Sequence, residues 1–353
     1  MSEQQKILVV GPSWIGDMIM AQSLYKLLAR RKPEAELHVL APAWSKPVLE
    51  LMPEVSRAIG QPVGHGKLGF SVRRELGYRL RSERYSQAIV LPRSFKSALV
   101  PYFASIPVRT GFRGEWRYSV LNDRRPFNAT VLDQTVKRFV MLGLQREETD
   151  LPEIDAPTLQ VSDENRLLTL ARFGLEADAN NVAIMPGAEY GSAKRWPLRK
   201  FTDLAARLVG VGVAVRVLGS ANERALGDAI VASIDQSRAR NLCGETSLAE
   251  VADLLSAATV AVTNDSGLMH MAAAVQTHVV ALFGSSSPSF TPPLTSTKRI
   301  FYLDLDCSPC FQRTCPLGHF HCMKDISVDA VSSAVVTALG GPREDGSNTA
   351  RGS

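Results

Sequence analysis

Short apolar runs alternate with amphipathic stretches along the chain, and this pattern predicts strands that alternate with helices. Lys6–Val10 reads KILVV and is expected to form a buried strand, and Met18–Arg30 follows it with apolar residues at helical spacing. Leu37–Leu40 is the next expected strand, so the chain opens with a β-α-β unit. Arg73–Arg84 is a basic predicted helix, and Gln87–Leu91 is another predicted strand.

The alternation begins again in the second half, after residues 155–175, where the composition is typical of a linker. Pro197 is expected in the first turn of a helix that runs to about Leu208. The clear strands predicted in this half are Val182–Met185, Val213–Leu218, Val260–Val262 and Val279–Phe283. Polar turns that contain glycine follow these strands, and parallel sheets bind ligands at the carboxyl ends of their strands. One edge of this sheet is therefore predicted to bind a ligand.

Two α/β domains are predicted, because the pattern occurs twice and 353 residues exceed the usual size of one domain. We expect one domain over residues 1–160, a second over 175–325, a C-terminal helix within 326–340 and a disordered tail over 341–353. No apolar run approaches the length of a transmembrane helix, and the first residues lack the features of a signal peptide. The protein is therefore expected to be cytoplasmic.

The charge is unevenly distributed between the two halves. Residues 1–150 carry 23 Lys and Arg against 14 Asp and Glu, a net charge of +9, whereas residues 151–353 carry 17 against 21, a net charge of −4. A basic first half favours an anionic partner, such as a phosphorylated acceptor, a membrane surface or nucleic acid. Solvated surface charges without a partner are the alternative.

One turn combines a buried strand with the start of a helix, and it spans Thr263–Gly267. Three of its side chains can cap the helix, namely Asn264, Asp265 and Ser266. Gly267 leaves room for a close approach to the backbone, and unpaired N–H groups with the helix dipole form an anion site. An ordinary helix with an Asp cap fits the same pattern. His270, one turn further on, is either a site residue or a structural histidine.

Asp17 follows Gly11 and Gly16 at the carboxyl end of the first predicted strand. The glycine spacing matches neither the dinucleotide fingerprint nor the phosphate loop of nucleotide triphosphatases, so neither function is predicted. Asp17 is either a favourable carboxylate in the first turn of a helix or an acid or base at the edge of a cleft.

Basic residues are interleaved with aromatic residues after the strand at 87–91. They are Arg93, Lys96, Arg109, Arg113 and Arg117. Such a segment can bind sugar phosphates or nucleic acid. No RNA-binding motif is present, so no nucleic-acid partner is expected; an RNA-binding protein would show salt-sensitive affinity centred on residues 73–125.

Four cysteines near the end of the second domain have the spacing C-x2-C-x4-C-x6-C. They are Cys307, Cys310, Cys315 and Cys322, with His319 and His321 close by. Clustered thiols in a cytoplasmic chain suggest a metal before a disulfide, but this spacing does not match the two-knuckle zinc pattern. Reduced thiols packed in a loop are therefore favoured, and a structural metal is the alternative.

Several stretches together resemble the lipopolysaccharide heptosyltransferases of glycosyltransferase family 9. They read GPSWIGDMIMAQSLY, PRSFKSALVP, PGAEYGSAKRWP, TNDSGLMHMAAA and FGSSSPSFTPP. The resemblance runs from Lys6 to Leu339 and is strongest to the members that add the second heptose. It implies the GT-B fold, in which two Rossmann-like domains with parallel sheets face a central cleft. The first domain would take the acceptor and the second ADP-heptose, and Val328–Leu339 would pack back on the first domain.

The reaction that the resemblance implies is an inverting transfer of L-glycero-D-manno-heptose from ADP-heptose to the first heptose of heptosyl-Kdo2-lipid A. Such an enzyme would work peripherally at the cytoplasmic face of the inner membrane. By the same resemblance, Asp17 is the catalytic base and Lys194 neutralises the departing diphosphate. The implied substrate residues are Glu189, Tyr190, Glu223, Thr246, Asp265, Ser266, Gly267 and His270, and the acceptor residues are Arg93, Lys96 and Arg113. Lys194 and a helix N-terminus can stabilise the diphosphate electrostatically, so metal-independent transfer without a cofactor is expected.

Other functions fit the same pattern less well. A heptosyltransferase for the first or third core heptose, or a GT-B sugar-nucleotide epimerase, would share the donor half and differ in the acceptor half. A non-catalytic module would bind ADP-sugars without turnover and would give Asp17 no special role.

Overall fold

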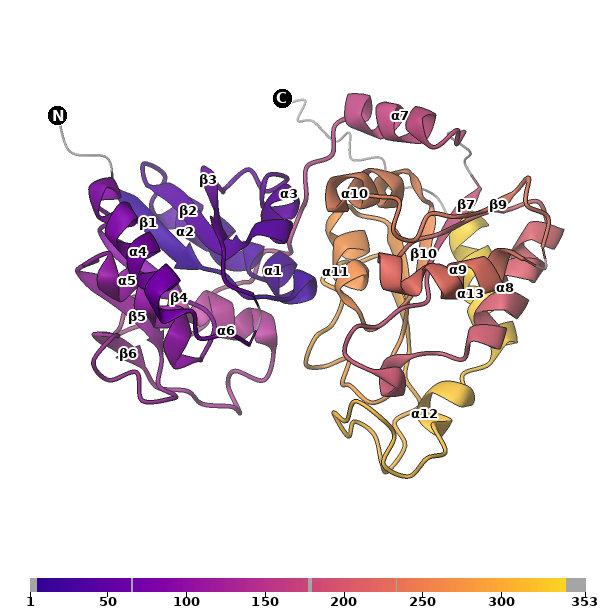
Figure 1. Cartoon of the computed structure of the whole chain (residues 1–353). Coiled ribbons are helices and arrows are strands. Elements are labelled where there is room, and N and C mark those ends of the chain that lie inside the picture. The colour runs from indigo at the N-terminus through magenta and orange to yellow at the C-terminus, as the bar shows by residue number, and fades with distance from the viewer. Residues whose placement is uncertain (1–4, 65, 177–179, 233, 341–353) are drawn as a thin grey trace, which may run out of the picture.

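The first domain is built on a six-stranded parallel sheet. A computed structural model of the chain describes residues 5–64, 66–176, 180–232 and 234–340 (Figure 1). The strands are β1 (Lys6–Val10), β2 (Glu36–Pro42), β3 (Arg57–Gln61), β4 (Gln87–Val90), β5 (Val108–Phe112) and β6 (Asp123–Arg125), and they lie in the order β3-β2-β1-β4-β5-β6. β1 is central and almost wholly buried because helices cover both faces, which explains its unbroken apolar run.

The helices of the first domain are α1 (Ile15–Met20), α2 (Gln22–Arg31), α3 (Lys46–Leu49), α4 (Phe70–Leu80), α5 (Leu99–Phe103) and α6 (Thr135–Leu142). The single helix predicted over Met18–Arg30 is in fact two helices that meet at Ala21, and the first begins three residues earlier. This earlier start places Asp17 inside the first turn of α1, at the carboxyl edge of the sheet.

The second domain repeats the plan with another six-stranded parallel sheet. Its strands are β7 (Asn181–Met185), β8 (Ala214–Val217), β9 (Ala239–Asn241), β10 (Val260–Asn264), β11 (His278–Leu282) and β12 (Lys298–Phe301), in the order β12-β11-β10-β7-β8-β9. Counted within each domain, both sheets have the order 3-2-1-4-5-6, in which the direction of winding reverses between the first and fourth strands. These reversal points lie between β1 and β4 and between β7 and β10, and the predicted α/β fold is confirmed.

The helices after β7 are α8 (Leu198–Gly210), α9 (Arg224–Val231), α10 (Leu248–Ala257), α11 (Gly267–Ala274), α12 (His321–Lys324) and α13 (Val328–Gly340). The expectation that α13 packs on the first domain is wrong. α13 lies along α8 and over β10 and β11, and its Val331 and Val335 are buried in the core of the second domain. Its apolar face is therefore covered by its own domain. The predicted tail, residues 341–353, lies outside the described residues.

The predicted linker, residues 155–175, is only partly extended. It contains α7 (Asp163–Arg172), which packs on α10, and Thr169 Oγ1 donates a 2.6 Å hydrogen bond to Asp253 Oδ2. Its extended part is held by the first domain, where Gln22 exchanges two hydrogen bonds of 2.8 Å with the backbone of Thr158. Both ends of the segment are therefore anchored. β12 is a strand beyond the last one predicted, and in the described ranges no helix is long and apolar enough to span a membrane.

Candidate active site

The two domains meet where α1 contacts α11 (Figure 1). Each helix begins at the carboxyl end of a central strand, and each contributes a glycine to the contact. A Cβ on Gly16 would lie 2.7 Å from Cδ2 of His270, and a Cβ on Gly267 would lie 2.9 Å from Cβ of Ile15. The close approach of the two backbones thus requires glycine at both positions, and it brings the residues that follow β1 beside those that follow β10.

Lys194 and Asp265 form an ion pair at the reversal point of the second sheet. The loop after β7 carries Lys194 and the turn after β10 carries Asp265, and Lys194 Nζ lies 2.5 Å from Asp265 Oδ2. Ser286 Oγ, after β11, donates a second 2.5 Å hydrogen bond to the same oxygen. Asp265 is 5% exposed, so its charge depends on these two partners.

The turn before α11 is built differently from the expected Asp cap. Ser266 occupies the N-cap position but makes no side-chain cap bond, and Asp265 turns to Lys194 instead. Asn264 is buried and joins the turn after β10 to the loop after β7. Its Oδ1 accepts a 3.0 Å hydrogen bond from the backbone N–H of Trp196, and its Nδ2 donates a 2.8 Å hydrogen bond to the carbonyl of Pro186. The start of α11 is left without a side-chain cap, as an anion site requires.

Asp17 lies on the first-domain side of this contact, next to Gly16. Burial raises the pKa of Asp17 to about 6; Lys194 and Arg138 oppose that rise, and Asp265 adds to it. Burial also lowers the pKa of His270 to about 4, so the imidazole is neutral at pH 7. The cluster therefore joins a carboxylate that can accept a proton near neutral pH to a neutral histidine and an ammonium group.

Replacing Gly16 with Ala should reduce kcat/KM by about 10²-fold, because the added methyl group must push α1 away from His270 and misplace Asp17. Steady-state kinetics would measure the loss. Gly210→Ala is the matched control, since nothing lies within 4 Å of a Cβ added at that helical glycine. Equal kinetics for the two variants would show that the tight α1–α11 contact is not needed for turnover.

Glu223 and Thr246 lie beyond the ends of β8 and β9. Glu223 Oε2 accepts hydrogen bonds from the backbone and hydroxyl of Ser220 at 2.7 and 2.9 Å, and Glu223 also lies against Gly187, where a Cβ would be 1.4 Å from Oε1. The Thr246 hydroxyl is buried and has no hydrogen-bond partner in the described structure. An unpaired buried hydroxyl is costly, and a bound ligand would satisfy it.

The other predicted substrate residues are placed less uniformly. Tyr190 lies by the cluster, with Lys194 Nζ 5.1 Å from its ring centre, and its hydroxyl donates to the carbonyl of Phe311 at 2.8 Å. Glu189 is exposed, and in the described structure no hydrogen bond or ion pair joins it to the cluster. The structure thus brings Asp17, Lys194, Asp265 and His270 together, with Tyr190 at their border.

The basic segment of the first domain divides into two kinds of residue. Arg109 and Arg117 are structural, because their guanidinium groups donate to backbone carbonyls, for example those of Val120 and Pro92 at 2.8 Å. Three others, Arg93, Lys96 and Arg113, make no ion pair within the described ranges. Arg93 Cζ lies 4.4 Å from the centre of the Phe127 ring, and Lys96 lies in the short helix after β4.

Two residues of the site were missed by the sequence reasoning. Ser286 lies in a stretch that carries the family resemblance, FGSSSPSFTPP, but nothing local marks it as a partner of Asp265. Arg138 lies on α6 and influences the pKa of Asp17, and no motif in the sequence marks it. Both act through contacts between residues far apart in the sequence.

The four clustered cysteines form no disulfide in the described part of the structure. Cys322 is buried, and the other three of the cluster, Cys307, Cys310 and Cys315, are partly exposed. Cys307 Sγ lies 4.0 Å from Nε2 of His319. In the part of the chain that the structure describes, no group of three or more His, Cys, Asp or Glu is arranged to hold a metal ion, so the metal alternative gains no support.

An Asp-x-Asp pattern, which chelates a metal in other glycosyltransferases, is present at Asp304 and Asp306. Both side chains are exposed in the loop between β12 and the cysteines, and neither is a member of the cluster around Lys194.

Known proteins share the whole architecture. Residues 73–321 match the glycosyltransferase family 9 (heptosyltransferase) profile. Lipopolysaccharide heptosyltransferase 2 of Escherichia coli K12 is 48% identical over 306 residues, 84% of this chain and 88% of that protein. Lipooligosaccharide heptosyltransferase 2 of Haemophilus influenzae is 42% identical over 308 residues, with the same coverage. The solved structure of E. coli ADP-heptose lps heptosyltransferase II has a TM-score of 0.85, with 43% identity, 95% of this chain and 98% of that chain covered.

Two parallel sheets of equal strand order, with polar residues gathered at both reversal points, are the GT-B fold of the solved heptosyltransferase. The family match covers most of the chain, and the identity to curated relatives is high. The chain belongs to glycosyltransferase family 9, the heptosyltransferases.

Proposed function

We propose that the protein transfers L-glycero-D-manno-heptose from ADP-heptose to the first heptose of heptosyl-Kdo2-lipid A, with inversion at the anomeric carbon. The observation that carries the chemistry is the cluster of Asp17, Lys194 and Asp265 at the contact between the domains. The choice of acceptor is supported by the identity to proteins named heptosyltransferase 2.

Asp17 is proposed as the general base. The acceptor hydroxyl oxygen attacks the anomeric carbon of the heptose, and its proton passes to the Asp17 carboxylate. The bond between the anomeric carbon and the β-phosphate oxygen breaks, and its electron pair stays on ADP. A pKa of about 6 leaves Asp17 mostly ionised at pH 7, yet basic enough to take a proton as the hydroxyl attacks.

Lys194 and the start of α11 are proposed to stabilise the departing ADP. The ammonium group of Lys194 faces the turn at Asp265–Gly267, and the uncapped N–H groups there can donate to phosphate oxygens. Asp265, Ser266 and His270 would contact the heptose and the diphosphate. Glu189 and Tyr190 would border the donor, Glu223 would bind the ribose, and the unpaired hydroxyl of Thr246 would bind near the adenine.

The first domain is proposed to take the acceptor, with Arg93, Lys96 and Arg113 toward its phosphates. This division follows from the basic charge of residues 1–150. Peripheral contact with the cytoplasmic face of the inner membrane is part of the same proposal, because the acceptor is a lipid.

A transfer assay tests the acceptor choice. ADP-heptose is offered with Kdo2-lipid A that carries no heptose or one heptose, in excess EDTA, while ADP release and product mass are followed. We expect transfer only to the one-heptose acceptor, with full activity in EDTA. Transfer to the heptose-free acceptor would assign the protein to the first step. Activity restored only by Mg²⁺ or Mn²⁺ would contradict metal-independent transfer, and binding of ADP-heptose without turnover would favour a non-catalytic module.

A further inference from the structure

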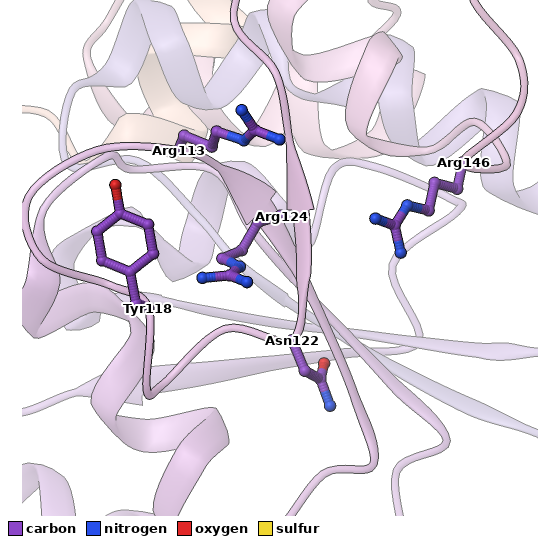
Figure 2. Close-up of a pocket in the computed structure, with 5 residues that line it drawn as sticks. All are labelled: Arg113, Tyr118, Asn122, Arg124 and Arg146. Atoms are coloured by element: carbon purple, nitrogen blue, oxygen red, sulfur yellow. The ribbon is translucent and has the colours of Figure 1, made fainter.

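A cavity of about 220 Å³ on the first domain is lined mainly by arginine. Its lining residues are Arg113, Tyr118, Asn122, Arg124 and Arg146 (Figure 2). Figure 2 shows the side chain of Arg146 pointing toward Arg124. The guanidinium group of Arg124 lies between Arg146 and Tyr118 (Figure 2). Arg124 Cζ lies 5.1 Å from the centre of the Tyr118 ring. The lining offers hydrogen-bond donors from three cations, and none of its five residues is acidic.

Acidic residues near the cavity arginines in sequence make no hydrogen bond or ion pair with them in the described structure. Glu147, next to Arg146, is exposed, and Glu115 accepts a 2.8 Å hydrogen bond from the backbone of Phe95. Two others are paired elsewhere. Asp123 binds Arg125, with Nε 2.9 Å from Oδ1, and accepts a 2.9 Å hydrogen bond from Thr110. Glu148 binds Arg31. Across the described ranges, no ion pair engages the guanidinium groups of the three cavity arginines. Three like charges that line one cavity and have no ion-pair partner among the described residues repel one another, so a bound anion would relieve the repulsion.

The cavity lies at the outer edge of the sheet and is connected to Asp17 by a row of basic residues. Arg113 follows β5, and Arg124 lies on β6, the last strand of the sheet. Arg93 follows β4 and lies against Gly114, the neighbour of Arg113. Arg93 and Arg113 therefore lie beyond the carboxyl ends of β4 and β5, on the same edge of the sheet where Asp17 follows β1.

Phe127 completes this row. Arg93 Cζ and Arg138 Cζ lie 4.4 and 5.0 Å from the centre of its ring, so one ring contacts both guanidinium groups. Arg138 is the end of the row nearest to Asp17 and influences the charge of that carboxylate. An acceptor that reaches Asp17 can therefore place an anionic group at the other end of the row, in the cavity.

Tyr118, which lines the cavity, has a second exposed aromatic side chain two residues before it in the chain. Trp116 is 87% exposed and Tyr118 is 66% exposed, and both lie on the loop between β5 and β6 that also carries Arg113. Large exposed aromatic side chains beside arginine are typical of surfaces that meet lipid headgroups. The cavity therefore suits a phosphate presented at a membrane surface better than a phosphate free in solution.

We propose that the cavity of Arg113, Arg124 and Arg146 is a phosphate-binding site that holds a phosphate group of the acceptor glycolipid. Paired guanidinium groups match phosphate oxygens through charge-assisted hydrogen bonds. This inference rests on the proposed function for the identity of the acceptor, but the phosphate site itself does not. Its role is to position the acceptor, so it should contribute to acceptor KM rather than to kcat.

The test replaces the two exposed arginines together, Arg113→Gln with Arg146→Gln, and uses Arg74→Gln with Arg79→Gln as the matched control. Arg74 and Arg79 are exposed arginines of the same domain, on α4, so the control removes the same charge away from the cavity. Each protein is assayed with the one-heptose acceptor before and after enzymatic removal of its phosphates. The cavity variant should raise acceptor KM by about 10–100-fold, with kcat and donor KM unchanged.

Removal of the acceptor phosphates should raise KM for the wild-type and control proteins by a similar factor and leave the cavity variant unaffected. If dephosphorylation raised the acceptor KM of the cavity variant as much as that of the wild type, the cavity would not bind that phosphate and the proposal would be overturned. An equal rise in KM for the control variant would also overturn it, since net charge alone would then explain the effect.

A calorimetric titration with inorganic phosphate separates this proposal from the proposed function. Binding by the wild type and the control, and loss of binding in the cavity variant, would support the phosphate site even if neither acceptor were glycosylated. The same loss of binding without any effect of acceptor dephosphorylation would identify free phosphate as the ligand and overturn the assignment to the glycolipid. Equal binding by all three proteins would overturn the site itself.

Discussion

Replacing Asp17 with Asn should lower kcat by about 10²–10⁴-fold and leave the affinity for ADP-heptose largely intact. Asn keeps the shape of the side chain but cannot accept the proton of the acceptor hydroxyl. Steady-state kinetics with the one-heptose acceptor, together with direct binding of ADP-heptose, would separate the two effects. Asp150→Asn is the control, because Asp150 is an exposed carboxylate of the same half of the chain. Equal losses in turnover and donor affinity would make Asp17 a binding residue.

The pH dependence of kcat/KM in the wild type should report the ionisation of Asp17. Because burial raises the pKa of Asp17 to about 6, the base is protonated below that pH, and kcat/KM should fall as the pH drops through 6. A base with an ordinary carboxyl pKa would keep its activity down to about pH 4.

The Asn variant should also be more stable than the wild type at pH 7–8. A pKa raised on folding means that the folded protein holds this proton more tightly than the unfolded chain. The contribution of this proton to the free energy of unfolding is complete below the unfolded pKa of 3.8, and it is lost as the pH rises through 6. Near neutral pH the buried charge costs stability, and Asn removes the cost. A higher Tm beside a lost kcat would exclude unfolding as the cause.

The central strands could be predicted from the sequence because both of their faces are buried. Residues 7–10 and 260–263 carry unbroken apolar or β-branched runs, since helices cover each sheet on both sides. Edge strands such as Asp123–Arg125 and Ala239–Asn241 are short and polar, and they form because a neighbouring strand supplies the hydrogen bonds. No local pattern marks such a strand.

The site could be predicted as a set of turns but not as a set of contacts. Asp17, Lys194 and Asp265 each follow a predicted strand, and parallel strands place such residues at one edge of each sheet. The approach of α1 to α11 depends on a contact between Gly16 and His270, which are far apart in the sequence. The packing of α13 on its own domain depends in the same way on surfaces that the chain assembles only when folded.

Lys194→Gln should reduce kcat/KM by about 10²–10³-fold, because it removes the ammonium group that is paired with Asp265 in the turn proposed to bind the diphosphate. It should also shift the pH dependence of the kcat/KM that remains. Lys194 lowers the pKa of Asp17, so its loss shifts the acid limb of kcat/KM to higher pH. Asp265 raises that pKa, so Asp265→Asn should shift the acid limb to lower pH.

Opposite shifts in the two variants would place both charges beside the same base, which a general loss of structure cannot do. Lys194→Arg is the control that keeps the charge, and it should hold the acid limb near its wild-type position even if turnover falls. Because Asp265 is buried, its carboxylate loses its ion-pair partner in Lys194→Gln, so the Tm of each variant must accompany the kinetics. Shifts in the same direction for Lys194→Gln and Asp265→Asn would exclude Asp17 as the group that titrates, and the search for the base would then move to another residue.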